Sequence, residues 1–171
     1  LYCVALGMDP LREGNRIRVH KEGKLLFGEA KNSGASDRLV PICALFDRCG
    51  IAWEIPHDMI RSLWWKYMIN VGVNQCSAVC RAPFGVFQQN EDARELMDSA
   101  MAEVIAVARA KGIDLSKRDI AEWHKVMAGL SPAGKTSMLQ DLEAGRKTEV
   151  DMFAGTLLAI AGELGIDTPV N

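Results

Sequence analysis

The chain has 171 residues, of which 49% are hydrophobic, so it is long enough to bury a substantial core. Its formal net charge is −2 with both signs interspersed, which gives no electrostatic argument for binding nucleic acid. No apolar stretch approaches the ~18 residues that a membrane-spanning helix needs. The five cysteines form no Cys-x-x-Cys pair, which favours reduced thiols in a cytoplasmic protein and argues against a metal site.

The two ends of the sequence carry information of their own. The chain opens at Leu1, inside the apolar stretch Leu1–Leu6, without the basic start and cleavage site of a secretory signal. It ends on Thr168-Pro169-Val170-Asn171, without a pattern that marks the end of a domain. We interpret both ends as cuts in a longer protein; a mature chain left after processing is the alternative.

The first 30 residues have β character. Tyr2–Leu6 is short and rich in β-forming residues, and Arg16–His20 alternates polar and apolar side chains. Lys24–Gly28 follows the turn signal Glu22-Gly23, which predicts a hairpin between the second and third of these segments. The character changes at about Ser33, so we expect a β segment over residues 1–30 and a helical domain over residues 31–171.

Hydrophobic periodicity predicts about six helices in the remainder. They cover residues 37–49, 58–80, 90–111 and 116–126, a short segment around Met138 and Leu142, and residues 148–164. Expected N-caps are Ser33 or Ser36, then Asp58 and Ser116, and the expected stops are Gly50, Gly112 and Gly165. The sequence thus predicts a mainly α fold, a helical bundle preceded by a short β segment.

A row of polar residues lies on the second of these helices. Lys66, Asn70 and Asn74 are spaced i, i+4, i+8, so they share one helix face with slight drift. Their neighbours are apolar, and unpaired buried polar groups are costly. The row could bond to a neighbouring helix or loop, or it could present donors to a polar ligand. In the second case a desolvated lysine has a lowered pKa, which suits proton transfer.

A second polar segment runs from Thr136 to Asp151. Ser137 and Thr148 are both good N-caps, and the carboxylate of Glu149 would be favoured by the dipole at its helix N-terminus. Arg146 and Asp141 can form a surface ion pair of little energetic value. These structural roles are sufficient by themselves to explain the segment.

Taken together, the two segments resemble a known family. The sequence contains Trp-x-Lys-x3-Asn-x3-Asn from Trp64, Ser-Met-x-Gln-Asp from Ser137, Gly-Arg-x-Thr-Glu-x-Asp from Gly145 and Gly-Ile-x-Thr-Pro from Gly165. In order and spacing these motifs closely resemble the C-terminal domain of ketopantoate reductases (2-dehydropantoate 2-reductases). The resemblance covers about residues 25 to 171, and Gly28-Glu29 resembles the end of the family's last strand before its domain switch.

The resemblance implies a fold and an activity. The fold would be the helical domain of the family, similar to the C-terminal domain of 6-phosphogluconate dehydrogenase, and residues 1–30 would be the remnant of a Rossmann domain. The activity would be NADPH-dependent reduction of 2-dehydropantoate to pantoate, in pantothenate and coenzyme A biosynthesis. Lys66 matches the catalytic lysine, while Asn70, Asn74, Ser137 and Glu149 match substrate-binding residues.

The nucleotide-binding part of the family's pattern does not occur in this sequence. No Gly-x-Gly-x-x-Gly segment is present, although a phosphate-binding turn needs such closely spaced glycines. We therefore expect NADPH to bind mainly to a domain outside this sequence, with Glu149 as its one contact here, and we expect the isolated chain to be inactive.

Two other interpretations are consistent with the sequence. The protein could be a related reductase of another 2-keto acid, because the contacts to the substrate side chain cannot be assigned. It could also be a non-catalytic helical module that uses an apolar face for assembly, although such a module has no use for the polar row. Whether the protein forms a homodimer is left open.

Overall fold

The computed structural model describes residues 1–8, 10–19 and 22–171 as two compact units, Leu1–Leu63 and Trp64–Asn171. The division falls within a helix, α2 (Met59–Ile69). The sequence placed a domain boundary after residue 30 instead. Residues 31–63 belong to the first unit, since they supply a strand and a helix that pack with the residues before them. The assignment of 1–30 and 31–171 as domains stays a prediction.

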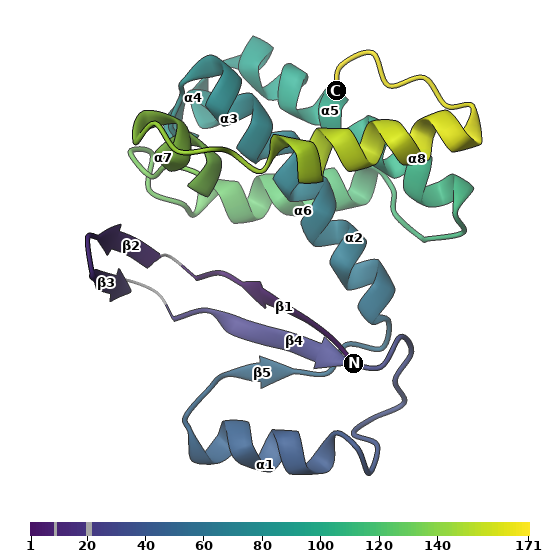
Figure 1. The fold of residues 1–171 in the computed structure, drawn as a ribbon. Coiled ribbons are helices and arrows are strands. Elements are labelled where there is room, and N and C mark those ends of the chain that lie inside the picture. The colour runs from purple at the N-terminus through teal and green to yellow at the C-terminus, as the bar shows by residue number, and fades with distance from the viewer. Residues whose placement is uncertain (9, 20–21) are drawn as a thin grey trace. The chain divides into compact units, whose positions relative to one another are not determined.

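The first unit is built on a small sheet (Figure 1). Its strands lie in the order β1 (Tyr2–Leu6), β4 (Lys24–Gly28) and β5 (Trp53–Glu54), with β1 antiparallel and β5 parallel to β4. A separate two-stranded ribbon pairs β2 (Pro10–Glu13) with β3 (Arg16–Val19). The predicted end of the second strand, His20, lies outside the described residues.

The predicted hairpin between the second and third β segments is wrong. β3 pairs with β2 across a turn at Gly14, whose φ of +62° suits glycine, while β4 pairs with β1. Gly23 lies so close to the end of β1 that a Cβ atom there would be 2.3 Å from the Leu6 carbonyl oxygen. Only glycine therefore fits where the chain returns beside β1. Gly23 has a positive φ of 69°, and the strand that follows it pairs with β1, a partner earlier in the chain than β3.

The helix of the first unit, α1 (Val40–Arg48), packs on Phe27 of β4. The Phe27 ring makes edge contacts with Phe46 at 5.0 Å and with Trp53 at 5.7 Å between ring centroids. The predicted serine cap is wrong, since Leu39 occupies the N-cap position without a side-chain hydrogen bond. Ser36 instead accepts with its carbonyl from the N–H groups of residues 39 and 40 in the preceding turn.

Two of the predicted helix signals in this region are confirmed. Gly50 follows the end of α1 with a φ of +66°. Asp58 Oδ1 accepts from the Arg61 N–H at 3.0 Å, as an N-cap of α2 does. Desolvation opposes ionisation of Asp58, but the hydrogen bonds from Arg61 and Lys31 outweigh it and lower the pKa of Asp58 below its ordinary 3.8.

This lowered pKa makes the contribution of Asp58 dependent on pH. The group stabilises the fold above its ordinary pKa, and the contribution is lost as pH falls through the lower folded-state pKa. We expect Asp58→Ala to cost about 0.5–2 kcal/mol at neutral pH. Asp58→Asn keeps an acceptor for the cap but does not titrate, so urea unfolding across the acid range should show a flatter loss of stability than in the wild type. Parallel acid limbs for the two proteins would contradict this.

The second unit is helical, which confirms the predicted mainly α fold. After the end of α2 it contains η1 (Asn70–Asn74), α3 (Gln75–Cys80), α4 (Phe84–Gln89), α5 (Glu91–Ala110), α6 (Lys117–Ala128), α7 (Ser137–Glu143), η2 (Asp151–Gly155) and α8 (Thr156–Leu164). The segments η1 and η2 are π-helical turns. The predicted helix over 58–80 is therefore α2, η1 and α3 in succession, and the predicted helix over 148–164 is η2 followed by α8.

The long helix α5, drawn behind α8 in Figure 1, packs against η1, α4, α6 and α8 and is the central helix of this unit by its contacts. Met97, Met101 and Val104 on its inner face are fully buried. Asn90 caps its start, and the predicted cap of α6 is confirmed, because Ser116 forms a capping box with Asp119. The helix α4 was not predicted, since six residues are too few for a periodic pattern.

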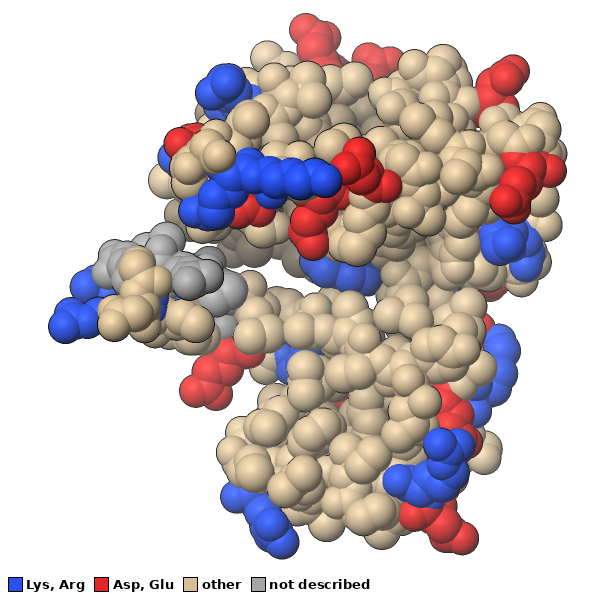
Figure 2. All heavy atoms as spheres, in the orientation of Figure 1, with Lys and Arg blue, Asp and Glu red and all other residues tan. Residues whose placement is uncertain are grey.

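The surface of the described residues carries charges of both signs. Figure 2 shows lysine and arginine side chains interspersed with acidic ones on the visible face, as the small net charge suggested. Among the described helices, none combines the length and the apolar composition that crossing a membrane requires.

Candidate active site

The polar row predicted from the sequence lies on α2 and on the wide turn η1. An α-helix advances a side chain by about 40° every four residues, and a π-helical turn holds one more residue per turn, which offsets this drift. η1 therefore keeps Asn74 more nearly in line with Lys66 than an uninterrupted α-helix would. Asn70 and Asn74 lie close together, since Asn74 Nδ2 donates to Asn70 Oδ1 at 3.4 Å.

Lys66 lies one helical turn before Asn70 and is mostly surrounded by protein. Burial lowers the pKa of its ammonium group below the ordinary 10.5, because desolvation disfavours the charged form. Within the described part of the chain, its Nζ has no hydrogen bond or ion pair. A lysine in this setting holds its proton less tightly than a surface lysine and has donors free for a ligand.

Two side chains connect η1 to η2. Gln75, directly after η1, donates with Nε2 to the Val71 carbonyl at 3.1 Å and accepts with Oε1 from the Ala154 N–H at 2.8 Å. Tyr67 donates to the Phe153 carbonyl at 2.7 Å. Burial raises the pKa of Tyr67 to about 12, so its hydroxyl stays protonated and able to donate near neutral pH. The helix ends on either side of η1 are thus joined to η2 through partly buried polar contacts.

Ser137 is not the N-cap that the sequence predicted. Thr136 takes that position, with its Oγ1 accepting from the Leu139 N–H at 3.2 Å, and Ser137 is the first residue of α7. Its side chain is exposed, and no hydrogen bond to it occurs among the described residues. The serine hydroxyl is therefore not used by the helix end.

Glu149 precedes Val150, the N-cap of η2, and its side chain is exposed. Its carbonyl accepts from the N–H groups of Met152 at 2.9 Å and Phe153 at 3.0 Å, which fixes its backbone to the start of η2. The predicted cap at Thr148 is wrong, because the N-cap position of η2 is Val150, without a side-chain hydrogen bond.

The ion pair predicted in the loop between α7 and η2 is confirmed. Arg146 Nε donates to Asp141 Oδ1 at 2.7 Å, and the Arg146 N–H also donates to the Asp141 carbonyl at 2.8 Å. Both side chains keep solvent contact, so the pair has little energetic value, but it closes the turn that leads to Glu149.

The elements that carry the five predicted residues belong to one unit. η1, with Asn70 and Asn74, contacts both α7, which begins at Ser137, and η2, which follows Glu149. Lys66 lies on the helix that continues into η1. The structure thus joins the segments, whereas the convergence of the five side-chain ends on one ligand stays a prediction. Sequence reasoning missed Gln75 and Tyr67, whose signal was a polar group on the buried side of an apolar helix.

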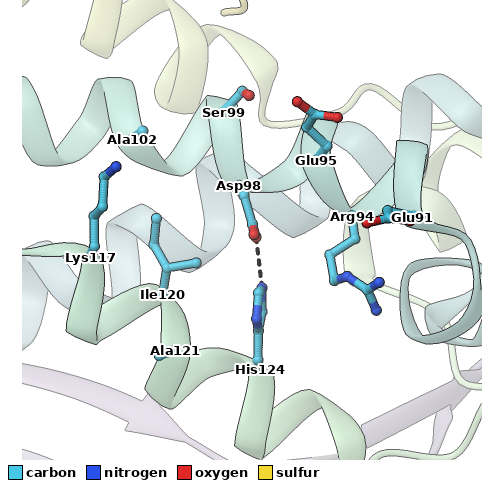
Figure 3. A pocket seen from close by; sticks show the side chains of 10 residues that line it. All are labelled: Glu91, Arg94, Glu95, Asp98, Ser99, Ala102, Lys117, Ile120, Ala121 and His124. Atoms are coloured by element: carbon cyan, nitrogen blue, oxygen red, sulfur yellow. Dashed lines mark hydrogen bonds and ion pairs between the residues drawn. The ribbon is translucent and has the colours of Figure 1, made fainter.

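An open depression of about 630 Å³ lies elsewhere in this unit, between α5 and α6 (Figure 3). His124 Nε2 and Asp98 Oδ1 approach to 2.7 Å across it, and Arg94 and Lys117 lie at its rim. None of the predicted site residues lines it. We interpret the His124–Asp98 contact as a link between the two helices, and we place the candidate active site at η1, because Lys66, which has no partner among the described residues, lies one turn before Asn70 and Asn74.

Comparison with known proteins identifies the family to which the chain belongs. Residues 58–171 match the family described as ketopantoate reductase PanE/ApbA C terminal. The solved structure of a dimeric ketopantoate reductase from Staphylococcus aureus has the same fold, with a TM-score of 0.86 at 20% identity, over 98% of this chain and 57% of that one. The fold is therefore that of a reductase's helical domain with neighbouring strands. The chain belongs to the ketopantoate reductase family.

Curated relatives give the extent of the match. A 2-dehydropantoate 2-reductase from Archaeoglobus fulgidus is 30% identical over 161 residues, which are 94% of this chain and 53% of that protein. One from Halobacterium salinarum is 28% identical over 138 residues, 80% of this chain and 45% of that protein. The chain thus spans about half the length of these relatives.

Proposed function

We propose that this chain is the substrate-binding half of an NADPH-dependent 2-dehydropantoate 2-reductase, which forms pantoate on the route to pantothenate. The observation that carries the proposal is the partly buried row of Lys66, Asn70 and Asn74, whose lysine has a lowered pKa and no partner among the described residues. The family match over residues 58–171 supports the same chemistry.

The coenzyme belongs mainly to another part of the protein in this proposal. The glycines of these 171 residues form no phosphate-binding turn, so the residues fit the keto acid and the reacting end of the coenzyme rather than its pyrophosphate. Glu149, exposed before η2, is the one residue that we assign a contact with NADPH as well as with the substrate. NADPH, when bound, supplies the hydride.

Lys66 supplies the proton. The keto carbonyl is neutral when the substrate binds, and its oxygen becomes anionic as the carbon receives hydride. A protonated Lys66 beside that oxygen stabilises the developing charge and donates a proton to it, which completes the alcohol. The lowered pKa of Lys66 favours this donation, since the ammonium holds its proton less tightly.

The remaining residues orient the substrate. Asn70, Asn74 and Ser137 donate to its carboxylate and hydroxyl oxygens, and the exposed hydroxyl of Ser137 is free to do so because Thr136 caps the helix. Glu149 accepts a hydrogen bond from the terminal hydroxyl of the substrate. Its negative charge also opposes the loss of the Lys66 proton before hydride transfer.

The test is a comparison of substrates with the purified full-length protein. NADPH consumption is measured with 2-dehydropantoate and with other 2-keto acids, and pantoate is identified as the product by mass spectrometry. The proposal requires 2-dehydropantoate to have the highest kcat/KM. A higher kcat/KM with another 2-keto acid would make the protein a related reductase, and no consumption with any of them would favour a non-catalytic assembly module.

The assignment of Glu149 predicts a specific loss of discrimination. We expect the wild type to prefer 2-dehydropantoate to the analogue without the terminal hydroxyl, and Glu149→Ala to lose about 10- to 100-fold of that preference. This equals one hydrogen bond to a charged group, about 1.5–3 kcal/mol. The measurement is the ratio of kcat/KM for the two substrates.

A matched control is available on α8. Glu163 is also an exposed carboxylate, and it lies outside the recognised motifs, so Glu163→Ala should keep the wild-type preference. If Glu149→Ala keeps the preference as well, Glu149 does not bind the substrate hydroxyl.

A further inference from the structure

The side-chain amide of Gln75 makes hydrogen bonds to groups outside its own helix as well as within it. Its Nε2 donates both to the Val71 carbonyl at 3.1 Å and to Asn171 Oδ1 at 3.0 Å, while its Oε1 accepts from the Ala154 N–H at 2.8 Å. One side-chain amide therefore bonds to three segments that are far apart in the sequence.

One of these contacts replaces a bond that a regular helix would make within itself, and a second bonds to the backbone of η2. In an α-helix the Gln75 N–H would donate to the Val71 carbonyl, but here it donates to Gly72. The side chain of Gln75 reaches back and bonds to Val71 instead. The Ala154 N–H, which lies in η2, donates to Gln75 Oε1. The same amide thus bonds to the backbone of both π-helical turns, η1 and η2.

The third contact anchors the amide to the central helix. Asn171 donates with Nδ2 to Glu103 Oε2 at 2.7 Å and to the Ala100 carbonyl at 3.2 Å, both on α5. Gln75 is consequently held at its Nε2 by Asn171 and at its Oε1 by η2. An amide fixed in this way has one orientation, with its oxygen toward Ala154.

We propose that Gln75 is a positioning residue for the reaction, which fixes the start of η2, and with it Glu149, against the turn that carries Asn70 and Asn74. The link to Glu149 is short, since the Glu149 carbonyl accepts from the N–H of Phe153, the neighbour of Ala154. Gln75 itself does not touch the substrate. This inference rests on the proposed function for its kinetic test, but its structural part can be measured without activity.

Gln88 offers a matched control. It is also a half-buried glutamine, and its Nε2 donates to two backbone carbonyls, Met127 at 2.8 Å and Leu130 at 3.0 Å. These contacts join α4 to the end of α6 and do not involve η1 or η2. Gln75→Leu and Gln88→Leu thus remove similar bonds from the same helical unit. The bonds of Gln75 lie at the candidate site, and those of Gln88 lie away from it.

The experiment compares these variants in the full-length enzyme. Gln75→Leu should lower kcat/KM for the keto acid by about 10- to 100-fold, through a raised KM as well as a lower kcat, because small displacements of orienting groups are costly. The KM for NADPH should rise less than the KM for the keto acid, because Glu149 is the one contact with the coenzyme that we assign to these residues. Gln88→Leu should lower the melting temperature but keep both KM values. Keto-acid kinetics in Gln75→Leu equal to those of Gln88→Leu would overturn the inference.

A second variant covers the case in which Gln75→Leu does not fold. Gln75→Glu keeps the acceptor for Ala154 but loses the donor, and its carboxylate would face the oxygens of Val71 and Asn171. Protonation restores a donor, so its kcat/KM relative to that of the wild type should recover as pH is lowered. A ratio independent of pH would count against the inference.

Amide hydrogen exchange separates this inference from the proposed function. If the wild type does not reduce 2-dehydropantoate, the proposed function fails and the kinetic test with it. Exchange then decides: the Ala154 amide and its neighbours in η2 should lose protection in the Gln75 variants and keep it in Gln88→Leu. Unchanged protection of Ala154 would overturn the positioning role, whatever the substrate of the enzyme.

Discussion

Lys66→Ala in the full-length enzyme is expected to lower kcat by ~10²–10⁴-fold, the usual contribution of a general acid, with little effect on coenzyme binding. The charge of Lys66 matters only once the carbonyl oxygen becomes anionic, so its loss acts on the transition state rather than on the bound ground state. Lys66→Arg should not restore the rate, because a guanidinium group holds its proton too tightly to donate it. Steady-state kinetics with the keto acid and with NADPH as the varied substrates provide the measurement.

The same residue should have the opposite effect on stability. Burial lowers the folded-state pKa of Lys66, so the charged lysine destabilises the fold at any pH below that value, and the cost disappears only above the ordinary 10.5. Lys66→Met, which keeps the length of the chain without the charge, should therefore equal or exceed the wild type in melting temperature at neutral pH. Any gain should shrink as the pH becomes strongly alkaline.

A purely structural lysine would give the reverse result. If Lys66 only ties helices together, its replacement lowers the melting temperature and leaves kcat per folded molecule nearly intact. Melting curves and kinetics on the same preparations distinguish the two cases. An unchanged kcat with a lowered melting temperature would remove Lys66 from the mechanism.

Two glycines in the helical unit should respond to alanine with opposite signs. A Cβ atom on Gly72 in η1 would lie 2.4 Å from Met101 Cγ, whereas one on Gly162 in α8 would meet nothing within 4 Å. We expect Gly72→Ala to destabilise the protein by about 1–3 kcal/mol through overpacking. Gly162→Ala should stabilise it by about 0.5–1 kcal/mol, because alanine loses less backbone entropy in a helix. Urea unfolding of both variants is the measurement.

A double-mutant cycle identifies the cause of the loss at Gly72. Met101→Ala alone should cost about 2–5 kcal/mol, since it leaves a cavity beside η1. In that background Gly72→Ala should cost much less than in the wild type, because the side chain that it would meet has been shortened. A cost of Gly72→Ala that is independent of residue 101, or a stabilisation like that of Gly162→Ala, would show that the close approach of α5 does not limit this position.

The sequence predicted best those features that depend on neighbouring residues alone. The caps at Asp58 and Ser116 and the stop at Gly50 are local hydrogen bonds or local backbone conformations, and the structure confirms them. Ser137 and Thr148 show the limit of such signals. Thr136 precedes Ser137 with an equivalent hydroxyl, and the sequence does not say which of two adjacent hydroxyls begins the helix.

Features that depend on distant partners were not predictable in this way. The pairing of β4 with β1 rather than with β3 joins residues separated by the whole β2–β3 ribbon. The π-helical turns lie where Gln75 and Tyr67 bond across the unit to η2, and no periodicity within Asn70–Asn74 marks those distant contacts. Within the candidate site, the i, i+4, i+8 spacing predicted that Lys66, Asn70 and Asn74 share one helix face. The proposed roles of Ser137 and Glu149 rest on the family resemblance alone.

The wide turn at η1 makes this part of the molecule sensitive to length in one direction. A π-helical turn holds one residue more than an α-helical turn, so deletion of one residue from Asn70–Asn74 would give a regular helix and keep Lys66 in phase with the residues after Gln75. Insertion of one further residue has no such outlet, and it would rotate Lys66 by up to about 100° relative to those residues, because each residue of an α-helix turns the chain by about that angle. The number of residues between Lys66 and Gln75 thus sets the direction of the Lys66 side chain, and this stretch tolerates the loss of one residue better than the gain of one.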